Sequence, residues 1–162
     1  MSNLSNSTIA LLNLTDIFKQ SAVNCVEAFF GISCQETQDW AVVEQLCEQS
    51  DLTLIVGSAS EEYQAILAIG INQDAIESFV GEKVDFNEAR DIFGEFANVY
   101  SGMLMDEADF NSIFGYLNQS VPVLYSEGTP FLPFVSGVQG KVLVDDGKWM
   151  YIGFAIKKAT KK

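Results

Sequence analysis

A carboxylate and a carboxamide stand three positions apart in the middle of the chain, at Glu95 and Asn98. At 100° per residue, the angular step of an α-helix, both fall within a sector of about 60° that also holds Asp91 and Gly102. The apolar residues of the same stretch fall on the opposite side: Ala89, Phe93, Phe96 and Tyr100. We therefore predict a helix that buries its aromatic face and exposes a ridge bearing an acid and an amide.

Two small residues, Gly94 and Ser101, fall on one flank of this ridge in the projection. A surface helix needs polar residues on its outer face, but it does not need small residues beside them. Asn98 is also a weak helix former, about half a kcal/mol worse than alanine, and Asp91 and Glu95 repel each other at i, i+4. These unfavourable choices indicate a ridge that enters the cleft of another molecule.

The helix that carries the ridge has a recognisable start. Asp85 and Glu88 form a variant of the capping box, in which a side chain before the helix accepts a free backbone N–H. We expect the helix to run from there to about Met105. A first long helix can be capped by Thr15 or Asp16 and should end near Phe30.

Strands and one short helix are expected between and after the two long helices. The strand patterns are Leu52–Gly57, Ala65–Ile71, Val121–Ser126, Lys141–Val144 and Trp149–Ile156, and the short helix is Asn72–Val80, before Gly81. The sequence Asp145-Asp146-Gly147-Lys148 predicts a hairpin between the last two strands. Ala41–Gln49 fits either a short helix or an irregular strand.

These elements predict an α/β domain of the two-layer α+β type, with two long helices packed on a mostly antiparallel sheet. We expect the domain at residues 10–158, an irregular arm at 1–9 within a generally irregular segment 1–14, and a basic tail at 159–162. Each half has a long helix followed by paired strands, and Asp16-Ile-Phe recurs as Asp91-Ile-Phe. If the halves are an internal repeat, Asn24 matches Asn98 at a separation of 74 and Ser21 stands in the place of Glu95.

Composition excludes several classes of function. The net charge of −13 repels nucleic acid and anionic lipid, so neither is expected as a partner. No apolar run approaches the length of a membrane span, and the absence of histidine excludes Ser-His, Cys-His and His-metal chemistry. The three cysteines form no metal-binding spacing; their odd number, in a chain with no recognisable signal peptide, leads us to expect reduced thiols and a cytoplasmic protein.

The ridge resembles the active helix of the CheX-like branch of the CheC/CheX/FliY chemotaxis phosphatases. The family pattern is an Asp or Ser, three residues, then Glu-x-x-Asn on an exposed helix, with a proline in the strand region that follows. Here it reads Asp91, Glu95, Asn98 and Pro122. Pro122 lies about one residue further from the Asn than the family spacing. The resemblance covers roughly residues 10–158, including the order of the segments and the final hairpin.

The resemblance implies a two-component signalling enzyme that hydrolyses the phosphoaspartate of a CheY-like response regulator. Asn98 would hold the attacking water, and Glu95 would pair with the lysine of the receiver's active site. Asp91, Gly94, Ser101 and Gly102 would be partner-binding, the three small residues allowing close approach. The protein would need no cofactor of its own, because the Mg²⁺ belongs to the receiver, and it would form a homodimer as similar CheX proteins do.

Two other interpretations remain open at the sequence level. A non-catalytic module of the same fold would keep the ridge and bind the receiver without accelerating dephosphorylation. A divalent-cation site built from Glu88, Asp91 and Glu95 would need further ligands from elsewhere, since all three lie on one helix.

Overall fold

Two long antiparallel hairpins form the centre of the sheet in the computed structural model, which describes residues 6–46, 50–119, 124–127 and 136–159. The first hairpin is β3 (Leu52–Ala59) with β4 (Tyr63–Ile71), and the second is β7 (Ser136–Val144) with β8 (Trp149–Lys158). The hairpins join through β4 and β8, which pair antiparallel from Tyr63 opposite Lys158 to Ile71 opposite Met150.

Four short strands complete the sheet among the described residues. β1 (Cys34–Glu36) and β2 (Ala41–Val43) both pair with β7, whereas β5 (Asn118–Gln119) and β6 (Leu124–Glu127) both pair with β3. The order is β1-β7-β8-β4-β3-β5, and every described pairing is antiparallel. The short strands of each half therefore pair with the long hairpin of the other half. The same arrangement thus occurs in both halves of the chain.

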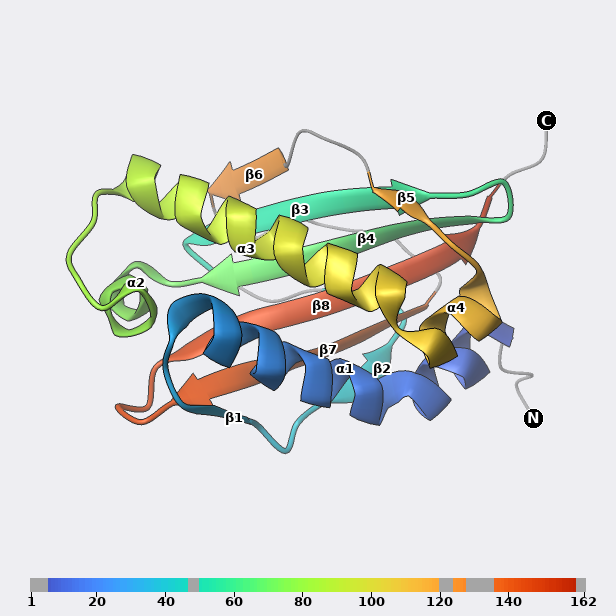
Figure 1. Cartoon of the computed structure of the whole chain (residues 1–162), viewed down its shortest axis with the longest axis horizontal. Helices are drawn as coiled ribbons and strands as arrows, with labels where there is room; N and C mark the ends of the chain where they lie inside the picture. Colours follow the sequence, from blue (N-terminus) through green and yellow to red (C-terminus); the bar gives the residue numbers. More distant parts are fainter. Residues whose placement is uncertain (1–5, 47–49, 120–123, 128–135, 160–162) are drawn as a thin grey trace.

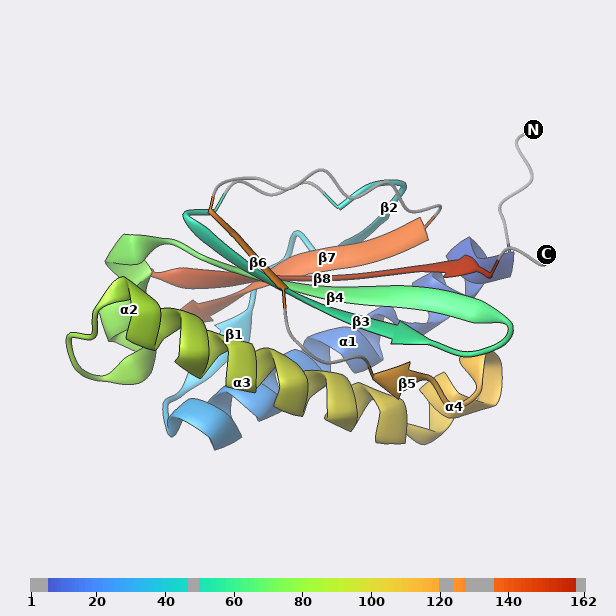
Figure 2. The same cartoon turned by 90° about the horizontal axis from the view of Figure 1, so that it is seen from above.

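The helices lie on one face of this sheet, which makes two layers (Figures 1 and 2). α1 (Asn6–Phe30) packs on β7 and α3 (Phe86–Asp106) packs on β3, and the two run side by side in opposite directions. α2 (Gln73–Val80) and α4 (Ala108–Phe114) lie near the two ends of α3. The predicted fold class is confirmed. None of the helices in the described part of the chain is long and apolar enough to span a membrane.

Aromatic side chains fill the space between the two long helices and the sheet. Phe30 of α1 lies 5.3 Å from Phe93 and 5.4 Å from Phe96, measured between ring centroids. Phe18 stacks on Phe154 of β8 at 5.1 Å. Burying rings of this size contributes most of the driving force for packing the helices on the sheet.

The local signals for turns and caps mark real boundaries. The Asp85 side chain accepts a hydrogen bond from the backbone N of Glu88 at 2.8 Å and starts α3. Gly81 ends α2 with φ of 88° and Gly147 turns the β7–β8 hairpin with φ of 84°, a region that favours glycine.

Several expected boundaries were wrong. α1 starts at Asn6, so the irregular segment predicted for 1–14, including the arm at 1–9, is helical from residue 6 onward. Its first turns are held by the buried side chains of Ala10, Leu11 and Leu14, which lie among Asn and Thr residues and the exposed Ile9 and Leu12. The segment 41–49, for which the sequence allowed either a short helix or an irregular strand, contains a strand at Ala41–Val43. α4 and β5 were not predicted. Residues 121–123 of the expected strand and 160–162 of the tail lie outside the described residues.

Candidate functional site

The outer face of α3 carries the predicted ridge. Asp91 and Glu95 are exposed, and Asn98 and Gly102 are half-buried. On the inner face, Phe93, Phe96 and Tyr100 have no exposed surface. The predicted orientation of the helix is confirmed.

Packing fixes the rotation of α3 about its own axis. Phe93 and Phe96 contact Phe30, and the Tyr100 hydroxyl donates to the backbone O of Phe18 at 3.1 Å. A rotation that moved Glu95 inward would expose these rings and leave the buried hydroxyl unpaired. The core therefore holds the ridge toward solvent.

Asn98 is connected to a part of the chain that sequence reasoning did not single out. Nε2 of Gln119 donates a hydrogen bond to Oδ1 of Asn98 at 2.7 Å. Gln119 lies in β5, at the edge of the sheet beside α3. A contact between residues 21 positions apart leaves no periodic signal in the sequence, which explains why Gln119 was missed.

The acidic side chains of the ridge point to solvent and are free to meet a partner. Among the described residues, neither Asp91 nor Glu95 makes an ion pair or a side-chain hydrogen bond. An exposed carboxylate without an internal partner costs little to pair with a cation brought by another molecule.

One of the expected partner-binding residues is not on the exposed face. Ser101 is 1% exposed, so the prediction that it touches a partner is corrected by its burial. Gly94 has little exposed surface of its own and Gly102 is half-buried. A Cβ added at either glycine would meet nothing within 4 Å, so both positions leave open space beside the ridge.

The other flank of the ridge is apolar. Val99 is 38% exposed and Met103 is 37% exposed, and both follow the ridge along α3. An acidic and amide-bearing ridge with an apolar border is a surface on which a protein can dock. The proline of the motif, Pro122, lies outside the described residues.

The equivalent region of the first half has a different construction. Aligning Asp16-Ile-Phe with Asp91-Ile-Phe, 75 positions apart, places Gln20 opposite Glu95 and Val23 opposite Asn98. Ser21 is only 4% exposed, so the prediction that it stands in the place of exposed Glu95 is wrong. Asn24, which the separation of 74 matches with Asn98, is exposed on α1 and accepts a hydrogen bond from Gln20, so α1 has an amide but no acid in the place of Glu95.

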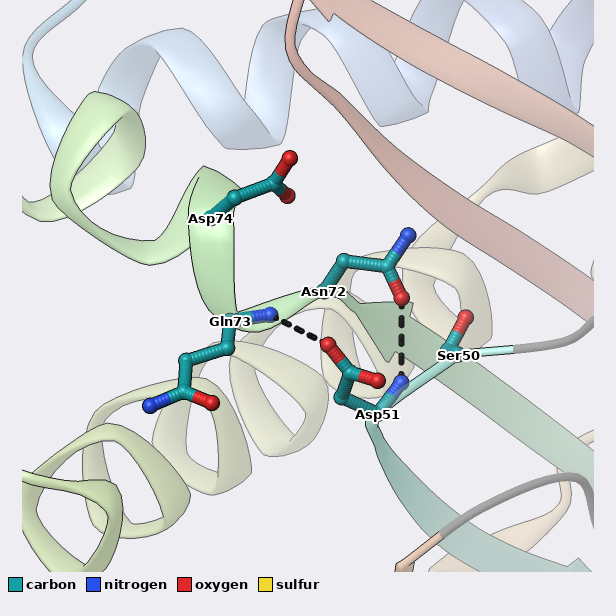
Figure 3. A pocket seen from close by; sticks show the side chains of 5 residues that line it. All are labelled: Ser50, Asp51, Asn72, Gln73 and Asp74. Carbon is teal, nitrogen blue, oxygen red and sulfur yellow. Dashed lines mark hydrogen bonds between the residues drawn. The ribbon is translucent and has the colours of Figure 1, made fainter.

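The protein surface also has an open cavity of about 640 Å³ away from the ridge (Figure 3). It is lined by Ser50, Asp51, Asn72, Gln73 and Asp74. Several of its polar groups are paired: the Asp51 carboxylate accepts from the Gln73 N at 2.8 Å, and Asn72 Oδ1 accepts from the Asp51 N at 3.0 Å. These bonds join the start of β3 to the start of α2. The buried Ser50 hydroxyl has no hydrogen-bond partner among the described residues.

Among the described residues, acidic and thiol side chains do not cluster, and two thiols have raised pKa values. No group of three or more carboxylate or thiol side chains there is placed to hold a metal ion. Burial raises the pKa of Cys25 to about 11 and, with Glu27 and Glu36 nearby, that of Cys34 to about 12. Both thiols are therefore protonated at neutral pH and poorly nucleophilic.

The fold is that of CheX-like and CheC-like proteins. The chain is similar in structure to the chemotaxis protein CheX from Vibrio vulnificus, with a TM-score of 0.70, 13% identity, and coverage of 90% of this chain and 99% of the other. CheX from Borrelia burgdorferi, crystallised as a CheX–CheY–BeF₃–Mg²⁺ complex, gives a TM-score of 0.52 at 12% identity, covering 88% and 96%.

The same fold also occurs in a Helicobacter pylori FliG–FliM complex, matched with a TM-score of 0.60 and 10% identity over 93% of this chain and 94% of the other. No protein-family model matches the sequence, and no curated protein matches it in a sequence search. At these identities the likeness defines the fold, and the site must be argued from the residues of α3.

Proposed function

We propose that this protein is a phosphatase that removes phosphate from the phosphoaspartate of a CheY-like receiver domain. One observation supports the proposal most strongly: Glu95 and Asn98 share the outer face of a helix whose rotation is fixed by its core. The fold agrees, since a CheX of this fold has been crystallised with CheY.

Asn98 serves the chemical step. A carboxamide is neutral, so it does not repel the phosphoryl oxygens, and it can hold a water molecule in line with the phosphorus. The water oxygen attacks phosphorus, the bond from phosphorus to the aspartate oxygen breaks, and the products are free aspartate and inorganic phosphate. Catalysis of this kind comes from positioning the water, for which a side chain held in place is suited.

Glu95 serves recognition. Its exposed carboxylate, one helical turn from Asn98, would pair with the lysine of the receiver's active site and so fix where α3 enters. Asp91 and Gly102 lie on the same ridge, and Gly102 leaves room for a close approach. The protein needs no cofactor of its own in this scheme, since the Mg²⁺ is held by the receiver. The proposal places the protein in the cytoplasm, in chemotaxis or a related two-component pathway, as a homodimer.

A single assay tests the proposal. Receiver domains of the CheY type from the same genome are phosphorylated with acetyl phosphate, the donor is removed, and phosphate loss is followed with and without this protein. The proposal predicts faster decay for at least one receiver, with turnover at substoichiometric amounts of protein. If no receiver loses its phosphate faster, the phosphatase assignment is wrong.

The second candidate function is a receiver-binding module without catalysis. The match to a FliG–FliM complex supports it, because this fold also occurs in a protein that was crystallised as part of a protein–protein complex. Binding of a phosphorylated receiver without faster decay would favour this second function.

A further inference from the structure

We propose that Gln119 is a positioning residue that holds the Asn98 carboxamide in place for water binding. The inference rests on the proposed function for its catalytic meaning, but the contact itself is a property of the free protein. Gln119 is not part of the motif that identified the ridge.

The hydrogen bond couples the orientation of the Asn98 carboxamide to that of Gln119. The terminal torsion of asparagine is broad and roughly two-fold, so a half-buried side chain can exchange its oxygen and nitrogen at little cost. Here the Gln119 Nε2 donates to Asn98 Oδ1 at 2.7 Å. Turning the Asn98 carboxamide alone would bring two N–H donors together, so Asn98 cannot turn unless Gln119 turns with it, and the contact restrains the position of the carboxamide.

Gln119 is itself held by the sheet. Its backbone pairs with Ser58 at the end of β3, and its neighbour Asn118 pairs with Ala59. Leu117, just before β5, has no exposed surface. Because β5 is paired with β3, Gln119 holds the Asn98 side chain at a fixed position relative to the edge of the sheet.

This contact leaves the groups that hydrolysis needs. Oδ1 of Asn98 has a second lone pair for a proton of the water, and its Nδ2 retains two donors. Because the side chain is ordered before the receiver arrives, less conformational freedom is lost in reaching the reactive geometry.

The test compares two substitutions in the same short strand. Gln119→Met keeps the length of the side chain but removes its donor, whereas Asn118→Met changes the exposed neighbour. Each variant is assayed for kcat and KM with the phosphorylated receiver, and the Asn98 side-chain NH₂ signals are recorded by NMR in the free protein. Thermal unfolding confirms that both variants are folded.

We expect Gln119→Met to lower kcat by about tenfold to a hundredfold with KM unchanged, and to shift and broaden the Asn98 NH₂ signals. Asn118→Met should match the parental protein in both measurements. Parental kcat in Gln119→Met, or unchanged Asn98 signals, would overturn the inference. If the parental protein has no phosphatase activity, the proposed function fails instead, and the NMR comparison alone decides whether Gln119 holds Asn98.

Discussion

The hydroxyl of Tyr100 lies 3.0 Å from the hydroxyl of Ser21, inside the core between the two long helices. Tyr100 is on the inner face of α3, behind the ridge that bears Glu95 and Asn98, and Ser21 is on α1. The same Tyr100 hydroxyl donates to the backbone O of Phe18. This polar link fixes both the distance between the helices and the rotation of α3.

Removing the link should weaken the fold. Tyr100→Phe deletes the buried hydroxyl but keeps the ring, so we expect a loss of about 1 kcal/mol in the free energy of unfolding. Tyr116→Phe is the matched control, because Tyr116 is 64% exposed and should tolerate the change. Equal stability of the two variants in urea denaturation would show that the buried link contributes nothing.

The same residue predicts a dependence of stability on alkaline pH. Burial raises the pKa of Tyr100, so the folded protein retains a proton that the unfolded chain loses near pH 10. Stability from this residue is complete below pH 10 and falls as the pH rises above it. Urea denaturation across this range should show a steeper loss for the parental protein and Tyr116→Phe than for Tyr100→Phe. If stability falls equally with pH in all three proteins, the dependence does not come from Tyr100.

The start of the ridge helix can be tested through its cap. Asp85→Ala removes the side chain that accepts from the Glu88 N, so the free energy of unfolding should fall by about 1 kcal/mol. Asn87→Ala changes an exposed residue in the first turn and should have little effect. Chemical denaturation of the two variants measures the difference. Equal free energies of unfolding for the two variants would show that the Asp85 cap does not stabilise the protein.

Features of the fold that depend on residues close together in the sequence could be predicted, whereas features that depend on distant residues could not. The ridge was predictable because Phe93, Phe96 and Tyr100 recur with the helical period and were bound to be buried. The capping signal at Asp85 was also local. The register of the sheet and the exchange of short strands between halves required the folded structure, since each depends on contacts between distant segments.

The errors at the site have the same origin. A helical projection gives the angle of Ser101 but not the width of the buried sector. α3 packs against β3 as well as α1, and the interior extends over the position of Ser101. Gln119 was missed because only the pairing of β5 with β3 brings it to Asn98.

Recognition of the receiver should depend on the charge of Glu95. Glu95→Lys would place two cations opposite each other in the proposed complex, and we expect affinity for the phosphorylated receiver to fall by at least about tenfold. Glu61→Lys makes the same charge change in the exposed β3–β4 turn, away from the ridge, and should bind almost as the parental protein does. Calorimetry or fluorescence anisotropy gives both affinities. An unchanged affinity in Glu95→Lys would remove this residue from the docking surface.

The most direct test of the account is the rate of phosphoreceiver hydrolysis with Asn98 replaced. Asn98→Ala removes the group that orients the water, and Asn98→Asp keeps its shape but adds a negative charge beside the phosphoryl oxygens. Single-turnover decay of the phosphorylated receiver is measured at saturating concentrations of each protein, and receiver affinity is measured separately. The account predicts that both variants lose at least about a hundredfold in rate and that Asn98→Ala keeps its affinity. Hydrolysis at the parental rate by either variant would contradict a catalytic role for Asn98.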